Sequence, residues 1–201
     1  MEGMSVLVGF IGAYLIGSIP FGLLASKFCH AKDPRTAGSG NIGFTNVLRI
    51  SGKKVGILTL MGDAGKGFLV AWLARQYFQH EHEYLLITVA VVLGHIFSIF
   101  LKFQGGKGVA TALAAIGGLH LTLGLAVTGI WLAFVAIFRY SSGGAIAAFL
   151  ALPILSATVF SGSVAFNLFA TGISLLILFR HHENISRLLS GTESKLSSNS
   201  S

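Results

Sequence analysis

The sequence has 201 residues, of which 53% are hydrophobic and only 10% charged, and its mean hydropathy is +0.78. A soluble core cannot absorb so large an apolar fraction, so the composition excludes a soluble globular protein and predicts an integral membrane protein. The net charge of +7 could suggest nucleic-acid binding. The positive residues lie at the ends of apolar segments, however, so they indicate membrane topology and anionic lipids or substrates, and no nucleic acid is expected as a partner.

Apolar segments long enough to cross a bilayer, at roughly 20 residues for an untilted helix, follow one another along the whole chain. We predict an all-α membrane protein with seven transmembrane helices, over residues 5–26, 54–74, 84–101, 109–119, 121–138, 143–160 and 164–179. The fourth is the weakest, because 117–120 is the only break in the apolar stretch 109–138. Without that break there would be six.

The distribution of Lys and Arg favours seven helices over six. With the N-terminus outside, Arg75 lies outside and Lys66 within a helix, which leaves twelve of the fourteen basic residues on the cytoplasmic side. This is the positive-inside pattern, and it puts the C-terminus in the cytoplasm. Six helices would place Arg139, Arg180 and the basic residues after them outside. A multi-pass membrane protein with its polar loops facing the cytoplasm is therefore expected.

The chain shows no sign of a separate soluble domain. We predict one transmembrane domain over residues 1–190, followed by a polar, serine-rich and disordered tail over residues 191–201. The single cysteine, Cys29, excludes an intramolecular disulfide framework. No group of residues has the spacing of a metal site, and no cofactor is expected.

The segment from Ser39 to Arg49 predicts an anion site in a cytoplasmic loop. Its glycines let backbone N–H groups approach a phosphate, and an arginine can grip phosphate oxygens with two parallel hydrogen bonds. A second loop, Gln104–Gly108, has a similar character around Lys107. The plainer interpretations are a flexible connector for the first loop and a tight turn for the second. Neither lysine of the two Gly-Lys pairs has the glycine and hydroxyl spacing of a nucleotide-binding P-loop, so ATP is not expected.

Ionisable residues inside a predicted helix require a partner. Asp63 and Lys66 are three residues apart, so they either neutralise each other or form a polar wall of a site. His95 is predicted to form a hydrogen bond between helices rather than to act as a catalyst. After the last apolar segment, His181 and Asn184 would share one face of a continuing helix.

Taken together, these motifs resemble the bacterial acyl-phosphate:glycerol-3-phosphate acyltransferases, the PlsY family. The resemblance extends over almost the whole chain in the family's order and rests on residues 17–22, 38–49, 63–67, 94–95, 105–111 and 180–184. It implies transfer of a fatty acyl group from acyl phosphate to the 1-hydroxyl of glycerol 3-phosphate, which gives lysophosphatidic acid and phosphate. This would be the first acylation of phospholipid synthesis, carried out in the bacterial inner (plasma) membrane and coupled to an enzyme that produces acyl phosphate.

The resemblance also implies which residues form the site. The implied catalytic residues are Ser39, Arg49, Lys107, His181 and Asn184. The implied substrate-binding residues are Gly38, Gly40, Asn41, Gly43, Thr45, Asn46, Asp63, Lys66, Gly105, Gly106 and Gly108.

Two questions stay open at the level of sequence. The general base is either His181 or a phosphate oxygen of the donor. The second question is whether the chain is an enzyme at all. The alternative function is that of a membrane transporter or binding protein for an organic phosphate, although a carrier would more naturally show matched polar breaks in two half-repeats. The His-x4-Asp pair of thioester-using membrane acyltransferases follows none of the histidines, which disfavours an acyl thioester donor.

Overall fold

A computed structural model of the chain describes residues 2–196, and within that range every regular element is a helix. The chain divides into two compact units, Met1–Leu119 and His120–Ser201. The all-helical prediction is confirmed for the described residues. The prediction that residues 1–190 form one domain stays a prediction.

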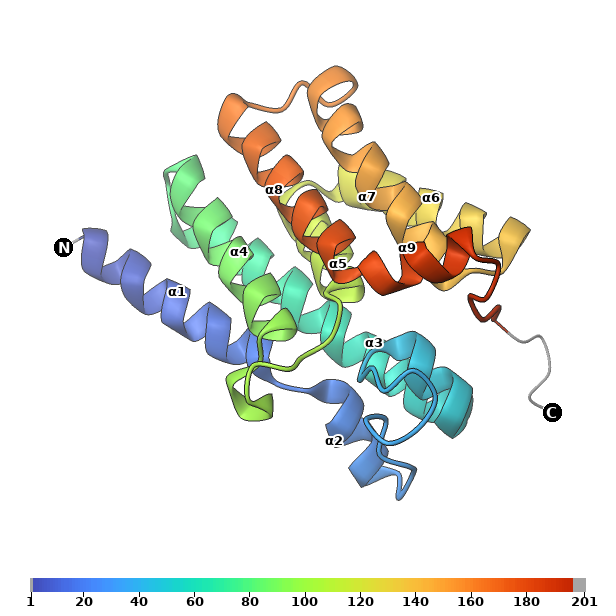
Figure 1. The fold of residues 1–201 in the computed structure, drawn as a ribbon. Coiled ribbons are helices and arrows are strands. Elements are labelled where there is room, and N and C mark those ends of the chain that lie inside the picture. The colour runs from blue at the N-terminus through green and yellow to red at the C-terminus, as the bar shows by residue number, and fades with distance from the viewer. Residues whose placement is uncertain (1, 197–201) are drawn as a thin grey trace. The chain divides into compact units, whose positions relative to one another are not determined.

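The first unit contains the helices α1 (Glu2–Ser18), α2 (Phe21–Phe28), α3 (Phe44–Tyr77), α4 (Glu81–Ile96) and α5 (Val109–Leu119), with a short 3-10 helix η1 (Ile99–Leu101) (Figure 1). Its closest helix pairs are α3 with α5 and α1 with α4. Glycines make both approaches tight, because a Cβ at Gly67 would overlap the carbonyl of Thr111 and one at Gly94 that of Tyr14. Small residues at helix crossings are typical of packing within a bilayer.

Two breaks in the first unit have local causes. Between α1 and α2 the axis bends by 42° at Ile19 and Pro20, where proline lacks the backbone N–H that a continuous helix needs. Within α3, Gly52 has φ +82 and ψ 179, which separates residues 44–51 from the long remainder of the helix. Such a left-handed conformation is easily adopted only by glycine.

The second unit contains α6 (Leu121–Phe138), α7 (Ser141–Thr158), α8 (Val164–Arg180) and α9 (His182–Leu189). In this unit α7 packs on both α6 and α8. The predicted break before residue 121 is confirmed, because His120 caps α6 by accepting a hydrogen bond at Nδ1 from the backbone N–H of Leu123, at 3.3 Å.

Four of the described helices, α3, α4, α6 and α7, are long and apolar enough to cross a membrane. Two bent pairs, α1 with α2 and α8 with α9, bring the total to six if each pair counts as one span. The remaining predicted segment, α5, is apolar but has only 11 residues. The last four predicted segments agree with α5 to α8 within about two residues, whereas the predicted segment 5–26 is broken between α1 and α2 and the segment 54–74 belongs to a helix that starts at Phe44. Seven crossings remain a proposal.

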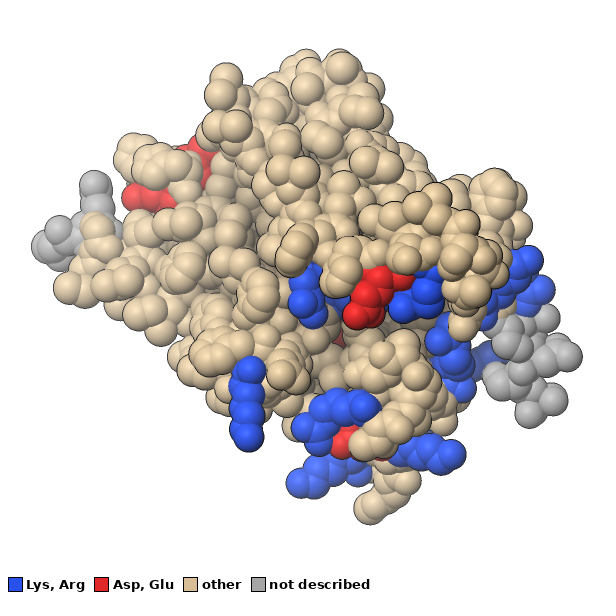
Figure 2. Space-filling view, in the orientation of Figure 1, with Lys and Arg blue, Asp and Glu red and all other residues tan. Residues whose placement is uncertain are grey.

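Charge is unevenly distributed over the first unit. On the face in view, basic side chains gather around α2 and the loop after it, and acidic side chains lie at the end where α4 begins (Figure 2). That end carries Glu81 and Glu83 in the first turn of α4. On this face, basic side chains therefore gather at one end of the unit and acidic side chains at the other.

Part of the predicted tail makes defined contacts. The backbone N–H of Leu196 donates to the carbonyl oxygen of Arg139 at 2.7 Å, and the Arg139 guanidinium donates to the carbonyl oxygen of Leu196 at 3.0 and 3.2 Å. The rest of the tail, residues 197–201, lies outside the described residues. Its predicted disorder stays a prediction.

Candidate functional site: two glycine loops and a bent helix

A single buried side chain, Asn46 in α3, organises the loop between α2 and α3. Its Oδ1 accepts a hydrogen bond from the backbone N–H of Ser39 at 2.9 Å. Its Nδ2 donates to the carbonyl oxygens of Pro34, Ala37 and Asn41 at 2.9, 3.1 and 2.8 Å. Asn46 was predicted to bind substrate, but both ends of its amide contact the loop backbone. This geometry makes it a residue that holds the loop in shape.

Glycine is required at two places in this loop. Gly38 and Gly40 have φ of +64 and +71, and a Cβ on Gly38 would overlap Oδ1 of Asn46. At the end of the loop, Oδ1 of Asn41 accepts from the N–H of Gly43 at 2.8 Å, and Gly43 is the N-cap of α3. The loop thus leads directly to the N-terminus of a helix, where unpaired N–H groups and the helix dipole favour an anion.

The helix begins earlier than the sequence predicts. Residues 39–49 were expected to form one loop, but α3 already starts at Phe44. The prediction was wrong for residues 44–49, because Gly43 caps the helix and the left-handed break comes only at Gly52. Arg49 therefore projects from a helix, and its side chain is exposed, as is that of Ser39.

The second glycine loop is fixed to the end of α4. The N–H of Gly105 donates to the carbonyl oxygen of Ile96 at 2.9 Å, and that of Gly106 donates to the carbonyl oxygen of His95 at 3.0 Å. Gly108 has φ +87, and α5 begins at the next residue. Lys107 is half-buried directly before this helix N-terminus. A lysine beside a helix N-terminus is an arrangement that favours an anion, and a phosphate site at this loop stays a prediction.

Asp63 and Lys66 form a buried ion pair, with Nζ of Lys66 2.9 Å from Oδ1 of Asp63. Lys66 also donates to the carbonyl oxygen of Ile19 at 2.7 Å, next to the bend between α1 and α2. Mutual neutralisation, one of the two predicted roles, is confirmed for this pair. Their contact with substrate stays a prediction.

His95 connects this ion pair with the second loop. Its Nδ1 lies 3.4 Å from Oδ1 of Asp63, which confirms a contact between helices, and a Cβ on Gly106 would overlap its Nε2. Farther along, the Thr111 hydroxyl donates to the carbonyl oxygen of Asp63 at 3.0 Å. Both ends of the loop are therefore anchored around Asp63. The sequence shows a polar residue in each of three apolar helices, namely Asp63, His95 and Thr111. It does not show that His95 and Thr111 both contact Asp63.

In the second unit, the helix after the last apolar segment does not continue straight. The axis bends by 61° between α8 and α9, and the buried His181 stands at the bend. The prediction of one continuing helix was wrong here. The Nδ1 of His181 lies 2.7 Å from the carbonyl oxygen of Ile177. A carbonyl oxygen can only accept, so Nδ1 carries the hydrogen and Nε2 is the acceptor of the neutral ring.

Asn184, in the first turn of α9, is buried and contacts an acidic residue that sequence reasoning missed. Its Nδ2 donates to Oε1 of Glu193 at 2.6 Å, and the hydroxyl of Ser142 donates to the same oxygen at 2.6 Å. Arg187 donates from Nε to Oε2 of Glu193 at 2.7 Å. A single glutamate thus links α9 to the start of α7.

The ionisation of Glu193 reflects these contacts. Burial raises its pKa, but hydrogen bonds from Ser142, Arg187 and Asn184, together with the positive charge of Arg187, outweigh burial and hold the pKa below its usual range. Glu193 is therefore a carboxylate at neutral pH.

The predicted residues form one group in each unit. The first unit holds Ser39, Arg49 and Lys107 with all the predicted substrate-binding residues, whereas the second holds His181 and Asn184. Within the second unit, the two predicted residues lie on either side of the start of α9. The roles of all of them remain predictions.

Comparison with known proteins identifies the family. The family described as glycerol-3-phosphate acyltransferase matches residues 7–191. The chain belongs to this family. A glycerol-3-phosphate acyltransferase of Janthinobacterium sp. (strain Marseille) is 45% identical over 199 residues, which cover 97% of this chain and 98% of the relative. One from Dechloromonas aromatica (strain RCB) is 43% identical over 196 residues, with 97% and 98% covered.

Two solved structures are similar over the same range. Both are crystal structures of PlsY (YgiH), an integral membrane glycerol 3-phosphate acyltransferase. The glycerol 3-phosphate form has a TM-score of 0.91 and 39% identity, with 96% of each chain covered. The lysophosphatidic acid form has a TM-score of 0.88 and 38% identity, with 95% of each covered.

Proposed function

We propose that this protein is a membrane enzyme that transfers a fatty acyl group from acyl phosphate to the 1-hydroxyl of glycerol 3-phosphate. The observation that carries this function is its likeness to a structure solved with glycerol 3-phosphate and with lysophosphatidic acid, a substrate and a product of such an acylation. In the reaction, the hydroxyl oxygen forms a bond to the acyl carbon while the bond from that carbon to the phosphate oxygen breaks. Inorganic phosphate leaves.

The first unit supplies the groups that hold the two anionic substrates. Arg49 and Lys107, each close to the N-terminus of a helix, neutralise the phosphates that must be brought together against their mutual repulsion. Backbone N–H groups of the two glycine loops add donors, and Ser39 adds a hydroxyl. Because the leaving group is already a good one, positioning and charge neutralisation supply most of the catalysis.

The second unit supplies the groups that handle the nucleophile. With Nδ1 donating to the carbonyl oxygen of Ile177, Nε2 is the acceptor of the neutral His181 ring, and we assign it as the general base that takes the proton of the attacking hydroxyl. Asn184 orients the hydroxyl or polarises the acyl carbonyl, and Glu193 positions Asn184. The tautomer of His181 supports a protein base over the donor phosphate.

We further propose seven membrane crossings in a bacterial inner membrane, with the N-terminus outside and the site facing the cytoplasm. The twelve basic residues on one side in this arrangement support it. Single cysteines at Met4 and Ser201, in a Cys29→Ser background, should react with an impermeant reagent in whole cells only at Met4. Reaction at both positions, or at neither, would remove the odd number of crossings.

Release of inorganic phosphate tests the activity directly. The purified protein with acyl phosphate and glycerol 3-phosphate should release phosphate continuously, and acyl-CoA in place of acyl phosphate should give no lysophosphatidic acid. The carrier alternative predicts counterflow of glycerol 3-phosphate in liposomes without turnover. Because acyl phosphate is a reactive product of another enzyme, we also expect functional coupling to an acyl-phosphate-producing enzyme.

A further inference from the structure

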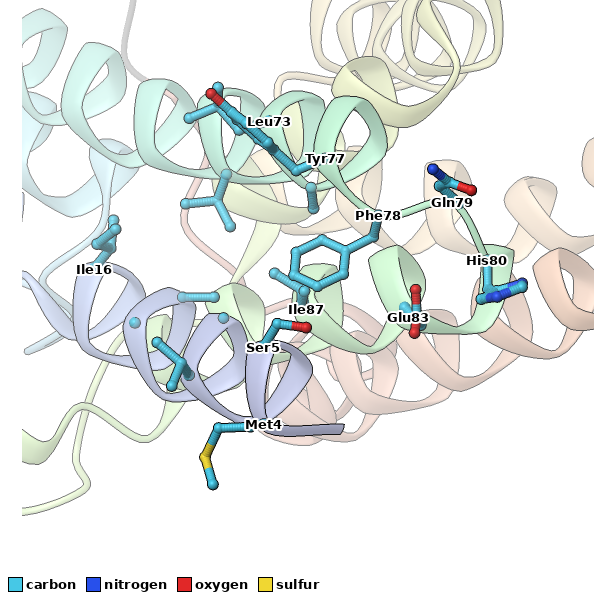
Figure 3. Close-up of a pocket in the computed structure, with 16 residues that line it drawn as sticks. Met4, Ser5, Ile16, Leu73, Tyr77, Phe78, Gln79, His80, Glu83 and Ile87 are labelled. Carbon is cyan, nitrogen blue, oxygen red and sulfur yellow. The ribbon is translucent and has the colours of Figure 1, made fainter. Parts of the chain in front are cut away.

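The first unit contains a groove whose lining residues all come from outside the two glycine loops. It lies between α1, the second half of α3 and the turn into α4, and its volume is about 990 Å³ (Figure 3). Cavities that bind small molecules span roughly 300–1,000 Å³, so this one is at the upper end. Nothing in the proposed chemistry uses it.

Missing side chains on α1 create the groove. A Cβ at Gly12 would meet no atom within 4 Å, although the residue lines the groove. One turn earlier, a Cβ at Gly9 would come within 3.0 Å of Ile87 and 3.1 Å of Phe78. At the other end of α1, by contrast, a Cβ at Gly17 would overlap the backbone of Val91. The helix is therefore in close contact at Gly9 and Gly17 and leaves a space between them at Gly12.

The groove is apolar along most of its length and polar at one end. Ile16 and Leu73 lie toward one end in Figure 3, and Gln79, His80 and Glu83 lie together at the other. Apolar residues at its edge are strongly exposed, with Met4 67% and Tyr77 79% accessible, so in a membrane the groove is open to the hydrocarbon. This is the shape that an amphiphile fits.

The charge at the polar end selects the headgroup. Glu83 lines the groove and Glu81 stands beside it in the first turn of α4, whereas none of the described lining residues is Lys or Arg. An anionic headgroup would be repelled there, and a headgroup with an ammonium group would be attracted. We propose that the groove binds one amine-bearing zwitterionic phospholipid, with an acyl chain between α1 and α3 and its ammonium group at Glu83.

The acyl chain of the substrate is a poorer occupant. A chain that enters from the glycine-loop end would bring its terminal methyl group against Gln79, His80 and Glu83, which leaves those polar groups without a matching partner. A membrane phospholipid places its own polar group there instead.

Gly12→Leu tests the proposal, because the added side chain has room and fills the groove. Gly129→Leu is the matched control: a glycine inside α6 whose Cβ would also meet nothing within 4 Å. Each protein is equilibrated in detergent with equal amounts of phosphatidylethanolamine and phosphatidylglycerol, and the retained lipid is measured by native mass spectrometry. Wild type and Gly129→Leu should retain one phosphatidylethanolamine, and Gly12→Leu should lose most of it at unchanged thermal stability.

Glu83→Gln tests the headgroup separately. It should keep a bound lipid but reduce the preference for phosphatidylethanolamine by about two- to five-fold, the range of a partly exposed charge pair. Equal retention by wild type and Gly12→Leu, or a wild-type preference for phosphatidylglycerol, would overturn the proposal. So would a Gly12→Leu protein with unchanged lipid retention and an altered preference for acyl phosphate chain length. The lipid measurement needs no turnover, so it is independent of the proposed reaction.

Discussion

The carbonyl oxygen of Ile177 lies 2.7 Å from Nδ1 of His181, one turn later in the chain, and fixes the tautomer of the imidazole at the bend between α8 and α9. Most catalytic histidines are oriented by a carboxylate. In α9, Glu183 lies 3.7 Å from the guanidinium of Arg187. At His181, a backbone carbonyl holds the Nδ1 side of the ring.

His181→Gln should lower the rate about 100-fold or more, because glutamine keeps a hydrogen bond but cannot accept the proton. The wild-type rate should fall toward low pH as the imidazole is protonated, and this dependence should weaken in the variant. The measurement is a pH-rate profile of phosphate release, with Asn184→Ala as a control that should be slower but keep the wild-type profile. A glutamine variant with near-wild-type turnover would instead favour the donor phosphate as base.

Arg49→Lys should be strongly impaired although it keeps the charge, because an ammonium group cannot reproduce the two-pronged grip of a guanidinium. We expect a loss of ~1 to 3 kcal/mol in transition-state stabilisation, the range for charge-assisted hydrogen bonds. Arg35→Lys, at an exposed arginine that pairs with Asp33 in the loop before α3, is the matched control and should leave kcat/KM unchanged. Equal effects of the two substitutions would mean that Arg49 contributes only to the orientation of the chain in the membrane.

Glu193→Gln should destabilise the second unit by about 1.5–3 kcal/mol, the range for hydrogen bonds to a charged group. The effect should depend on pH with a defined sign. The pKa of Glu193 is lower in the folded than in the unfolded chain, so its contribution is present above about pH 4.5 and disappears as the pH falls through the folded pKa. Thermal unfolding of both proteins in detergent between pH 3 and 7 would measure it. A constant difference across this range would contradict the assignment.

Asp63→Asn should unfold the protein at a much lower temperature, because it leaves the Lys66 ammonium buried without a counter-charge. Removal of one partner of a buried pair typically costs about 3–5 kcal/mol. The double variant Asp63→Asn with Lys66→Met should recover much of that loss, since neither charge then remains. Additive losses in the double-mutant cycle would mean that the two residues are not coupled.

Helix positions could be predicted well from the sequence, and the contacts of the site much less so. Hydropathy placed the apolar stretch 109–138, and the break at 117–120 divided it correctly into residues 109–119 and 121–138, because His120 caps α6 with its side chain. The bend at His181 and the early start of α3 depend on single capping residues and a left-handed glycine, whose effects are local and subtle.

The site contacts that the sequence did not predict are mostly between residues far apart in the chain. Glu193 is nine residues from Asn184 and 51 from Ser142, so its role follows only from the fold. The same holds for the contacts of Asn46 with the loop backbone, because amides and glycines are common in both anion sites and tight loops. The predicted contact of Asn46 with substrate stays a prediction.

The left-handed break at Gly52 has a consequence for the response of the protein to its surroundings. Spanning helices tilt when the hydrocarbon becomes thinner than their apolar length. The short segment that carries Arg49 precedes the break, and Leu48 in that segment packs directly on Gly56 in the long part, where an added Cβ would come within 3.1 Å of the Leu48 backbone. The short segment is therefore tied to the long part across the break, so a tilt of the long part of α3 carries the arginine with it.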